Sequence, residues 1–423
     1  MDLAWADGSK TSWGRVTWQE SQSARLCSVT TAERLLSGVV HCESRQHLSE
    51  RLDRGDRLRI KFGIDPSAPD IHLGHLVPMR LLRKWQREGH LAVLVIGDFT
   101  ARIGDPTGRS ATRPQLSVGE VQANAKTYLD QLFCVVDPDQ AEVRRQSEWY
   151  QSFDLAAVLR LASTATVAQL LQRSDFEQRV RSELPVSFHE LFYPLLQGYD
   201  SVAIQADVEL GGTDQLFNLM RGREVQEAYG QRRQDIVTVP LLEGLDGEKK
   251  MSKSLGNAIA VTEAPGSQFG QLMSIPDRLI TRYLALLTDA SAEELADTER
   301  SLQGGTVNPR DAKADMAEQL VSVLHGPVRA QEAREEFFRV HRDHDLPSQI
   351  PNVSLPGHRQ WDIRELLVAA GLAQSKGEAA RLVQGGAVEL AGQRVGDWRK
   401  PLTVEPGVVL RAGPRRVVRL TQG

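Results

Sequence analysis

Cysteine is scarce in this sequence, and the few positions where it occurs exclude two kinds of protein. Of 423 residues only three are cysteine, Cys27, Cys42 and Cys134, and they lie far apart along the chain. Three scattered cysteines supply neither a disulfide framework nor a cysteine-ligated metal site. A small secreted domain held together by disulfides is therefore excluded, and we expect a cytoplasmic protein.

Long apolar runs are absent as well. No stretch approaches the roughly 20 apolar residues that a membrane-spanning helix needs. The first 28 residues mix Trp5, Trp13 and Trp18 with charged and polar residues and contain no apolar core of the kind found in a signal peptide. We therefore expect no membrane association, and we interpret residues 1–28 as a disordered extension.

The net charge of −4 conceals an uneven distribution. Residues 361–423 contain 10 Lys and Arg against 6 Asp and Glu, a net of +4, which leaves 41 basic against 49 acidic residues, or −8, in the rest of the chain. A basic segment attached to an acidic body indicates a polyanionic partner for that segment, although such a small imbalance is also typical of ordinary solvated surface.

Strands and helices alternate between residues 57 and 245. Residues 57–65 alternate apolar and polar side chains, and residues 91–97 form a continuous apolar run typical of a strand buried on both faces. The helical periodicity of residues 76–86 between them predicts a βαβ unit, and hence a parallel sheet. Further elements expected here are a strand at 201–210, a helix from an N-cap at Thr213 or Asp214 to a stop at Gly230, and a strand at 236–242.

The last third of the chain has a different pattern. Residues 265–345 show helical periodicity, most clearly at 277–287 and 313–325. Residues 343–360 contain three prolines and no periodicity, so we interpret them as a linker. Two short helices followed by apolar-alternating strands are expected after it.

Two histidines, His72 and His75, lie three residues apart where the first strand gives way to a helix. A zinc site would need a third or fourth ligand at a recognisable spacing, and none is nearby. Histidines at such a place can simply cap the helix or fill a crevice. They can also belong to an anion site, because a helix N-terminus offers unpaired N–H groups and partial positive charge.

A second cationic signal favours the anion site. Residues 248–254 read EKKMSKS and follow the last predicted strand. By itself this segment is typical of a solvated loop. A lysine loop and a histidine-bearing helix start, both beyond the strand ends of one parallel sheet, together predict a triphosphate site. Gly74 would let a nucleobase or ribose lie against the backbone, and the lysines would meet the charge that develops as pyrophosphate departs.

These two motifs, HLGH at 72–75 and KMSKS at 250–254, resemble the signature of class I aminoacyl-tRNA synthetases. Four further stretches resemble the bacterial tyrosyl-tRNA synthetases, and the last sixty residues resemble an S4-type RNA-binding domain. The four stretches are GIDPSAPDIHLGH (63–75), IGDPTGR (103–109), YPLLQGYDS (193–201) and GGTDQ (211–215). The resemblance covers the chain from about residue 29 onward.

The resemblance implies an α/β fold with several domains. They are a Rossmann-like parallel-sheet catalytic domain at 29–262, a helical anticodon-side domain at 263–345, a linker at 346–360 and a small α+β S4-like RNA-binding domain at 361–423.

It also implies a tyrosine–tRNA ligase, which converts tyrosine and ATP to tyrosyl-adenylate and pyrophosphate and then transfers tyrosine to the 3′ end of tRNA(Tyr). Mg²⁺ would accompany the phosphates, without a dedicated metal site or a prosthetic group, and the protein would be a homodimer that does not bind DNA. The alternatives are a tryptophanyl-tRNA synthetase-like ligase, a small-molecule nucleotidyltransferase and a non-catalytic RNA-binding paralogue.

Tyr193, Gln197 and Asp200 fall at i, i+4 and i+7, on one face of a helix. This could be a polar face in contact with solvent, but the intervening apolar residues favour a pocket for a small polar aromatic substrate. The resemblance assigns the tyrosine site to Tyr193, Gln197, Asp105, Gln215 and Asp200, the last accepting the phenol hydroxyl. A pocket that satisfies this hydroxyl rejects phenylalanine, a rule that tyrosyl-tRNA synthetases usually illustrate.

The resemblance assigns the other roles as follows. Catalysis falls to His72, His75, Lys250 and Lys253. ATP binding falls to Gly63, Asp65, Ser67, Gly74, Gly212, Asp214, Arg109 and Arg113, of which the two arginines could equally form surface ion pairs. The candidates for tRNA binding are Arg381, Arg394, Arg399, Lys400, Arg415 and Arg416.

One position departs from the family pattern. Where many members carry a tyrosine that also touches the substrate phenol, this chain has Lys61. Either Asp200 holds the phenol alone or another group replaces the missing contact.

Overall fold

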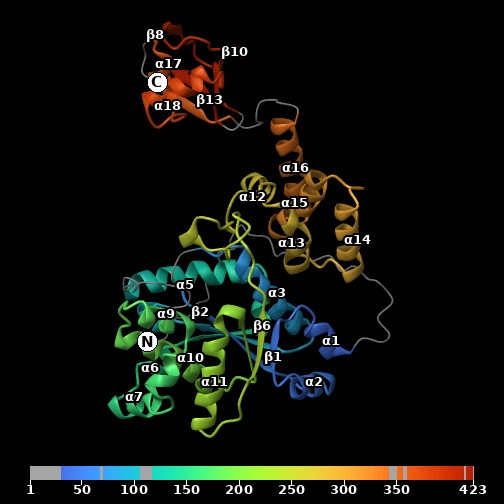
Figure 1. The fold of residues 1–423 in the computed structure, drawn as a ribbon, viewed down its shortest axis with the longest axis vertical. Helices are drawn as coiled ribbons and strands as arrows, with labels where there is room; N and C mark the ends of the chain where they lie inside the picture. The colour runs from blue at the N-terminus through green and yellow to red at the C-terminus, as the bar shows by residue number, and fades with distance from the viewer. Residues whose placement is uncertain are drawn as a thin grey trace. The chain divides into compact units, whose positions relative to one another are not determined.

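The protein is described here by a computed structural model, shown in Figure 1. It describes residues 30–66, 70–104, 117–342, 350–355, 360–413 and 416–422, so the expected extension at 1–28 lies outside the described residues. The chain forms two compact units, one ending at Pro327 and the other beginning at Val328. None of the helices in the described residues combines the length and apolarity needed to span a bilayer.

A six-stranded sheet forms the centre of the first unit, with strand order β1-β6-β5-β2-β3-β4 (Figure 1). All neighbouring strands are parallel except β1, which pairs antiparallel with β6 at one edge. The predicted parallel sheet is therefore confirmed. The strands are β1 (His41–Glu43), β2 (Arg59–Ile64), β3 (Leu91–Ile96), β4 (Ala141–Arg145), β5 (Val208–Gly212) and β6 (Asp235–Val239).

The predicted βαβ unit is β2, α3 (Leu73–Arg87) and β3. Strand β3 is buried from Ala92 to Ile96, as its continuous apolar run indicated. Helix α3 is amphipathic and buries Leu82 and Trp85 almost completely. Because α3 starts immediately after His72, the polypeptide delivers both histidines to the carboxyl end of β2.

The strand predicted at 201–210 is wrong in its first half. Helix α10 (Tyr193–Ala203) continues through Ala203, and the chain then turns at Gln205, whose φ is +52°. Only from Val208 does the backbone pair with β2 and β6. Apolar residues at every second position at the end of a helix mimic strand alternation, and only the hydrogen-bonding partners distinguish the two. The strand predicted at 236–242 likewise ends at Val239.

The helix predicted to start at Thr213 or Asp214 and to stop at Gly230 corresponds to α11 (Leu216–Ala228). The other helices of the sheet region are α1 (Thr31–Leu35), α2 (Arg45–Asp53), α4 (Thr100–Ile103), α5 (Val118–Leu132), α6 (Ser147–Tyr150), α7 (Leu155–Ala162), α8 (Val167–Leu170) and α9 (Ser174–Arg181).

The helical region after the sheet packs onto it without forming a separate compact unit. The Arg80 guanidinium of α3 donates to the carbonyl oxygen of Leu287 at 2.8 Å and pairs with Asp289 at 2.6 Å. The boundary between the two compact units falls after residue 327, and the domain limits expected at 262 and 345 stay predictions. The predicted helices at 277–287 and 313–325 are confirmed. The helices of this region are α12 (Pro265–Leu272), α13 (Ile280–Leu287), α14 (Ala292–Gln303) and α15 (Pro309–His325), whereas α16 (Pro327–His341) lies in the second unit.

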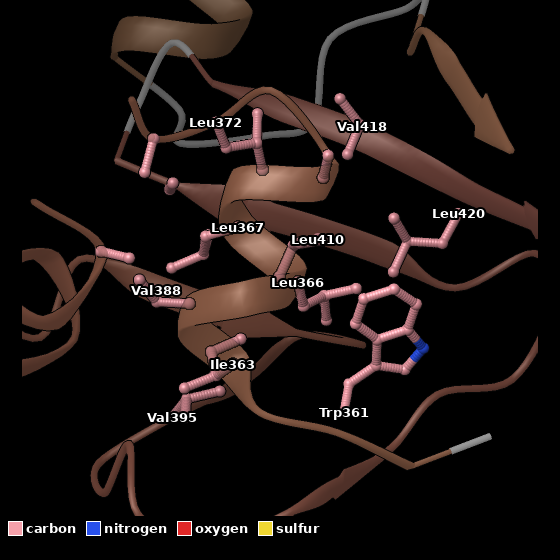
Figure 2. Packing of buried hydrophobic residues seen from close by; sticks show 14 of the residues in the cluster. Trp361, Ile363, Leu366, Leu367, Leu372, Val388, Val395, Leu410, Val418 and Leu420 are labelled. Atoms are coloured by element: carbon pink, nitrogen blue, oxygen red, sulfur yellow. The ribbon is translucent and has the colours of Figure 1, made fainter. Parts of the chain in front are cut away.

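The second unit contains a five-stranded sheet packed against two helices, as predicted for a small α+β domain. Its core gathers around Leu366, Leu367 and Leu410, each fully buried (Figure 2). The sheet order is β10-β9-β12-β13-β7, and β11 pairs with β8. The elements are β7 (Asn352–Leu355), β8 (Gln360–Trp361), α17 (Ile363–Ala369), α18 (Lys376–Gln384), β9 (Val388–Leu390), β10 (Gln393–Arg394), β11 (Leu402–Thr403), β12 (Val409–Ala412) and β13 (Val417–Gln422).

The linker predicted at 346–360 is wrong where β7 lies. Residues 352–355 pair in parallel with β13, so they form an edge strand of the small sheet. The sequence of this four-residue strand shows no alternation that distinguishes it from the surrounding proline-rich segment. Its strand conformation depends on pairing with β13, more than sixty residues away, and a local pattern does not reveal that pairing.

Candidate active site

A cavity of about 650 Å³ opens beyond the carboxyl ends of β2 and β5. This is the edge of a parallel sheet at which ligands usually bind. Most of the predicted site residues line it, although they come from segments up to about 180 residues apart. The predicted residues lining the cavity are Gly63, Asp65, His72, Gly74, His75, Tyr193, Gln197, Asp200, Gly212, Asp214, Gln215 and Lys250. Ser67, Asp105, Arg109 and Arg113 lie outside the described residues.

The two histidines form the N-terminal end of α3. Their ring centroids are 4.0 Å apart, and the backbone N–H of His72 donates to Nδ1 of His75 at 3.2 Å. Burial, together with the neighbouring imidazole and the loop lysines, lowers the pKa of His72 to about 2. Burial likewise lowers the pKa of His75 to about 4. Both imidazoles are therefore neutral at pH 7 and act as hydrogen-bonding groups and not as charges.

A metal site at this position has no support in the described part of the chain. No group of three or more His, Cys, Asp or Glu side chains is arranged there to hold an ion. The two histidines instead lie at the N-terminal end of a helix, where the helix dipole places partial positive charge beside the cavity.

The lysine loop lies on the same side of the sheet as the histidines. The chain that follows the loop is hydrogen-bonded to the start of α3, where the backbone N–H of Leu73 donates to the carbonyl oxygen of Ile259 at 3.0 Å. The buried anchor of the loop is Met251, whose N–H donates to Leu242 at 2.7 Å. The loop is thus fixed at Met251, and the chain that follows it is fixed at Ile259, while the lysine side chains stay partly exposed.

Two of the three lysines of the loop contact carboxylates. Lys250 Nζ lies 2.6 Å from Asp214, and Lys253 Nζ lies 3.5 Å from Asp70. The side chain of Lys253 is 35% exposed and is not among the groups that line the cavity. Partly exposed pairs of this kind are screened by solvent and contribute little, so an incoming phosphate can take both ammonium groups.

Asp65 lies at the floor of the cavity and is held by two hydroxyls. Tyr193 Oη donates to it at 2.8 Å, and Thr100 Oγ1 donates at 2.6 Å. A Cβ atom at Gly97 would lie 2.0 Å from a carboxylate oxygen of Asp65, so only glycine permits this arrangement. The close approach of the backbone fixes the carboxylate.

Asp200 lies at the closed end of the cavity and is 2% exposed. Gln146 Nε2 donates to its carboxylate at 2.8 Å and Trp149 Nε1 at 3.2 Å. Tyr150 Oη also lies 3.2 Å away, but it shares its one hydrogen with the carbonyl oxygen of Leu196 at 2.5 Å. Burial raises the pKa of Asp200 to about 7, against the lowering effect of the Lys61 charge and of the hydrogen bonds. All three polar residues of α10 face the cavity, so the alternative of a solvent-facing helix surface does not hold.

Lys61 does not take the place of the missing tyrosine. Its ammonium group is fully buried and pairs with Glu209 at 2.8 Å. It also donates to the carbonyl oxygen of Gln197 at 2.7 Å and to Ser201 Oγ at 2.8 Å. Lys61 is not among the groups that line the cavity. Its hydrogen bonds to Gln197 and Ser201 hold α10 in place instead.

The structure brings in residues that sequence reasoning missed. Gln146, Trp149 and Tyr150 follow β4, whose carboxyl end lies at the same sheet edge as the histidines. A polar residue directly after a strand can indicate a site residue. Here the strand itself was not predicted, because β4 reads AEVRR and shows no apolar pattern. Thr100 and Glu209 were missed because their roles depend on partners distant in the sequence.

The predicted tRNA-binding residues lie on the second unit. Arg381, Arg394, Arg399, Lys400 and Arg416 are all exposed, and Arg415 lies outside the described residues. Arg416 pairs with Glu378 at 2.8 Å, whereas Arg399 stacks on the Trp398 ring at 4.4 Å. The structure thus leaves basic groups accessible on this unit.

Comparison with known proteins agrees with this geometry. The family described as "tRNA synthetases class I (W and Y)" matches residues 53–342, and the "Tyrosine--tRNA ligase SYY-like C-terminal domain" matches residues 344–408. The tyrosine–tRNA ligase of Moorella thermoacetica is 49% identical over 88% of this chain and 90% of its own length. That of Thermotoga maritima is 48% identical over 92% of this chain and 96% of its own length.

Solved structures share the fold at lower identity. Tyrosyl-tRNA synthetase from Aeropyrum pernix superposes with a TM-score of 0.58 at 23% identity, covering 72% of this chain and 97% of its own. Tryptophanyl-tRNA synthetase from Plasmodium falciparum gives 0.54 at 15% identity, over 70% of this chain and 81% of its own. Fold alone does not separate the two amino-acid specificities, and the curated sequence relatives decide between them.

The chain belongs to the tyrosine–tRNA ligases, class I aminoacyl-tRNA synthetases with a tyrosine–tRNA ligase C-terminal domain.

Proposed function

We propose that the cavity at the ends of β2 and β5 condenses tyrosine with ATP and that the second unit presents tRNA(Tyr) for the transfer step. One observation carries the proposal: a single cavity joins the N-terminus of α3, the lysine loop and the buried carboxylate of Asp200. One end then suits a triphosphate, and the other suits a phenol.

In the first step the tyrosine carboxylate attacks the α-phosphorus of ATP in line, and pyrophosphate leaves. A carboxylate is already ionised at neutral pH, so no general base is needed, and positioning and charge stabilisation lower the barrier. His72 and His75 are neutral and would donate to phosphate oxygens without trapping the product by charge. Lys250 and Lys253 would meet the charge on the departing pyrophosphate.

Four other residues that line the cavity have predicted binding roles. Asp214 and the backbone at Gly212 would hold the adenosine, and Tyr193 and Gln197 would hold the tyrosine amino group. Asp65 is already bonded to Tyr193, which supports placing it between the two substrates.

Mg²⁺ would accompany the phosphates as a partner of the substrate. The described residues contain no cluster of acidic or histidine side chains able to enclose it, and Asp214, a carboxylate that lines the cavity beside the loop, is paired with Lys250. Phosphate oxygens and water would therefore supply most of its ligands, as is usual for this ion.

In the second step the 3′-terminal ribose of the tRNA attacks the activated carbonyl, and AMP leaves. The exposed basic residues of the second unit support a role in binding the RNA backbone by charge and shape. The similar tyrosine–tRNA ligases are bacterial, which supports placing this reaction in the cytoplasm.

We also propose that the protein is a homodimer. The segment from α7 to residue 188 exposes six large apolar side chains, more than an ordinary surface needs. Charged substitution of Phe188, which is 72% exposed, should shift the sedimentation coefficient to that of a monomer. Unchanged sedimentation would contradict the proposed interface. The six residues are Leu155, Leu159, Val167, Val180, Leu184 and Phe188.

Labelled pyrophosphate exchange into ATP tests the proposed function. We expect exchange that depends on tyrosine and is absent with tryptophan or with no amino acid. Exchange supported by tryptophan would indicate the wrong substrate, exchange without an amino acid would indicate a nucleotidyltransferase, and no exchange at all would indicate a non-catalytic paralogue.

A further inference from the structure

We infer that Gln146 determines specificity for tyrosine by donating a hydrogen bond from its carboxamide to the substrate phenol oxygen. Asp200 accepts a hydrogen bond from the phenol O–H. The inference rests on the proposed function of the cavity and fills the place left by the lysine at position 61.

The two oxygens of the Asp200 carboxylate have different surroundings. Oδ1 accepts from Trp149 Nε1 and lies 3.2 Å from Tyr150 Oη, and neither of these residues lines the cavity. Among the described residues Oδ2 accepts from Gln146 Nε2 alone, at 2.8 Å, and Gln146 does line the cavity. A carboxylate oxygen has two acceptor sites, so Oδ2 has one left for a phenol O–H that enters from the cavity.

The orientation of the Gln146 amide follows from the groups around its oxygen. Oε1 accepts from the backbone N–H of Phe99 at 3.1 Å and from that of Thr100 at 2.9 Å. Exchanging the amide oxygen and nitrogen would point N–H groups at two backbone N–H groups, so the nitrogen must face Asp200. Gln146 is 2% exposed, which holds this orientation.

The amide nitrogen therefore has a donor to spare. An NH₂ group carries two hydrogens, and the described residues account for one of them, the bond to Asp200. The second lies next to the carboxylate oxygen that has a free acceptor site. A phenol hydroxyl is both a donor and an acceptor, and this pair of groups offers it both partners.

Other candidate donors near this end of the cavity are engaged elsewhere. Lys61 is turned beneath α10 and pairs with Glu209. The Gln197 amide donates one hydrogen to Glu209 at 3.2 Å, and its other hydrogen is assigned above to the amino-acid part of the substrate; the single hydrogen of the Thr100 hydroxyl goes to Asp65 at 2.6 Å. Without the bond from Gln146 the buried phenol oxygen would lack a donor, which is unfavourable in a water-poor site.

The test compares tyrosine and phenylalanine in the same variant. Gln146→Met removes the donor at nearly constant volume, and Gln151→Met, at an exposed position directly after α6, serves as the matched control. In pyrophosphate exchange we expect kcat/KM for tyrosine to fall roughly 10- to 100-fold and that for phenylalanine to change less than about 3-fold. The control should match the unsubstituted chain with both amino acids.

Gln146→Glu guards against a folding failure, because it keeps an acceptor for the amides of Phe99 and Thr100 but, when ionised, cannot donate. It should lower the tyrosine-to-phenylalanine ratio in the same direction. Equal losses with both amino acids in both variants would show a purely structural role and overturn the inference, as would an unchanged ratio. Failure of the unsubstituted chain to exchange with tyrosine would instead overturn the proposed function itself.

Discussion

Replacing Lys61 by methionine should destabilise the first unit, because it leaves a charge buried without its partner. Lys61 and Glu209 are 0% and 1% exposed, and their charged groups are 2.8 Å apart. Breaking such a pair on one side costs about 3–5 kcal/mol. Glu209 keeps hydrogen bonds from Gln197, Ser201 and Gln234. These offset part of the loss, so we expect the lower end, about 3 kcal/mol.

The double variant Lys61→Met with Glu209→Gln separates the charge effect from the loss of packing. With both charges removed, the remaining carboxamide can still accept from its neighbours, and we expect about 2 kcal/mol to be recovered. Lys249→Met, at an exposed lysine of the first unit, should change stability by less than about 0.5 kcal/mol.

The suitable assay is native-state hydrogen exchange read by mass spectrometry on peptides from β2 and β5. The chain has two compact units, so a single unfolding transition would mix their stabilities, whereas these peptides report the first unit alone. A loss below about 1 kcal/mol in Lys61→Met, or a double variant as unstable as the sum of its single variants, would refute the reasoning.

Four further predictions concern the cavity and the second unit. Lys253→Ala should slow pyrophosphate exchange by about 100-fold while leaving the dissociation constant of tyrosine unchanged, and a normal exchange rate would remove the assigned role of the loop. Because burial raises the pKa of Asp200 to about 7, and the phenol donates to the carboxylate form, tyrosine affinity should weaken as pH falls from 8 to 6. Calorimetric titration should show up to about a tenfold loss at the lower pH, and a flat profile would contradict it. Removing residues 328–423 should abolish aminoacylation but spare exchange, since the whole cavity lies in the first unit, and loss of both would make the second unit structural. Gly97→Ala should raise the KM for tyrosine at least 10-fold, because its Cβ would lie 2.0 Å from Asp65, and an unchanged KM would show that this carboxylate is free to move.

Local patterns in the sequence were sufficient for the elements that carry the ATP end of the site. The apolar run of β3 and the periodicity of α3 predicted a parallel βαβ unit, which in turn placed His72 and His75 at a strand end. The lysine loop was found by composition, and the polar face of α10 by its 3.6-residue period. Each of these features repeats within a few residues, so short-range sequence contains it.

The sequence could not distinguish a helix end from a strand at 201–210, nor find β7 in a proline-rich segment, because both depend on which backbone lies alongside.

The tyrosine end of the site was decided by tertiary structure. The partner of Lys61 is 148 residues away, and Gln146 reaches Asp200 from a strand that has no apolar pattern. Buried polar groups must find hydrogen-bond partners, but the fold alone determines which distant residue supplies them. Sequence periodicity therefore specifies the scaffold and its charged loop, whereas the selection of a phenol depends on contacts that only folding assembles.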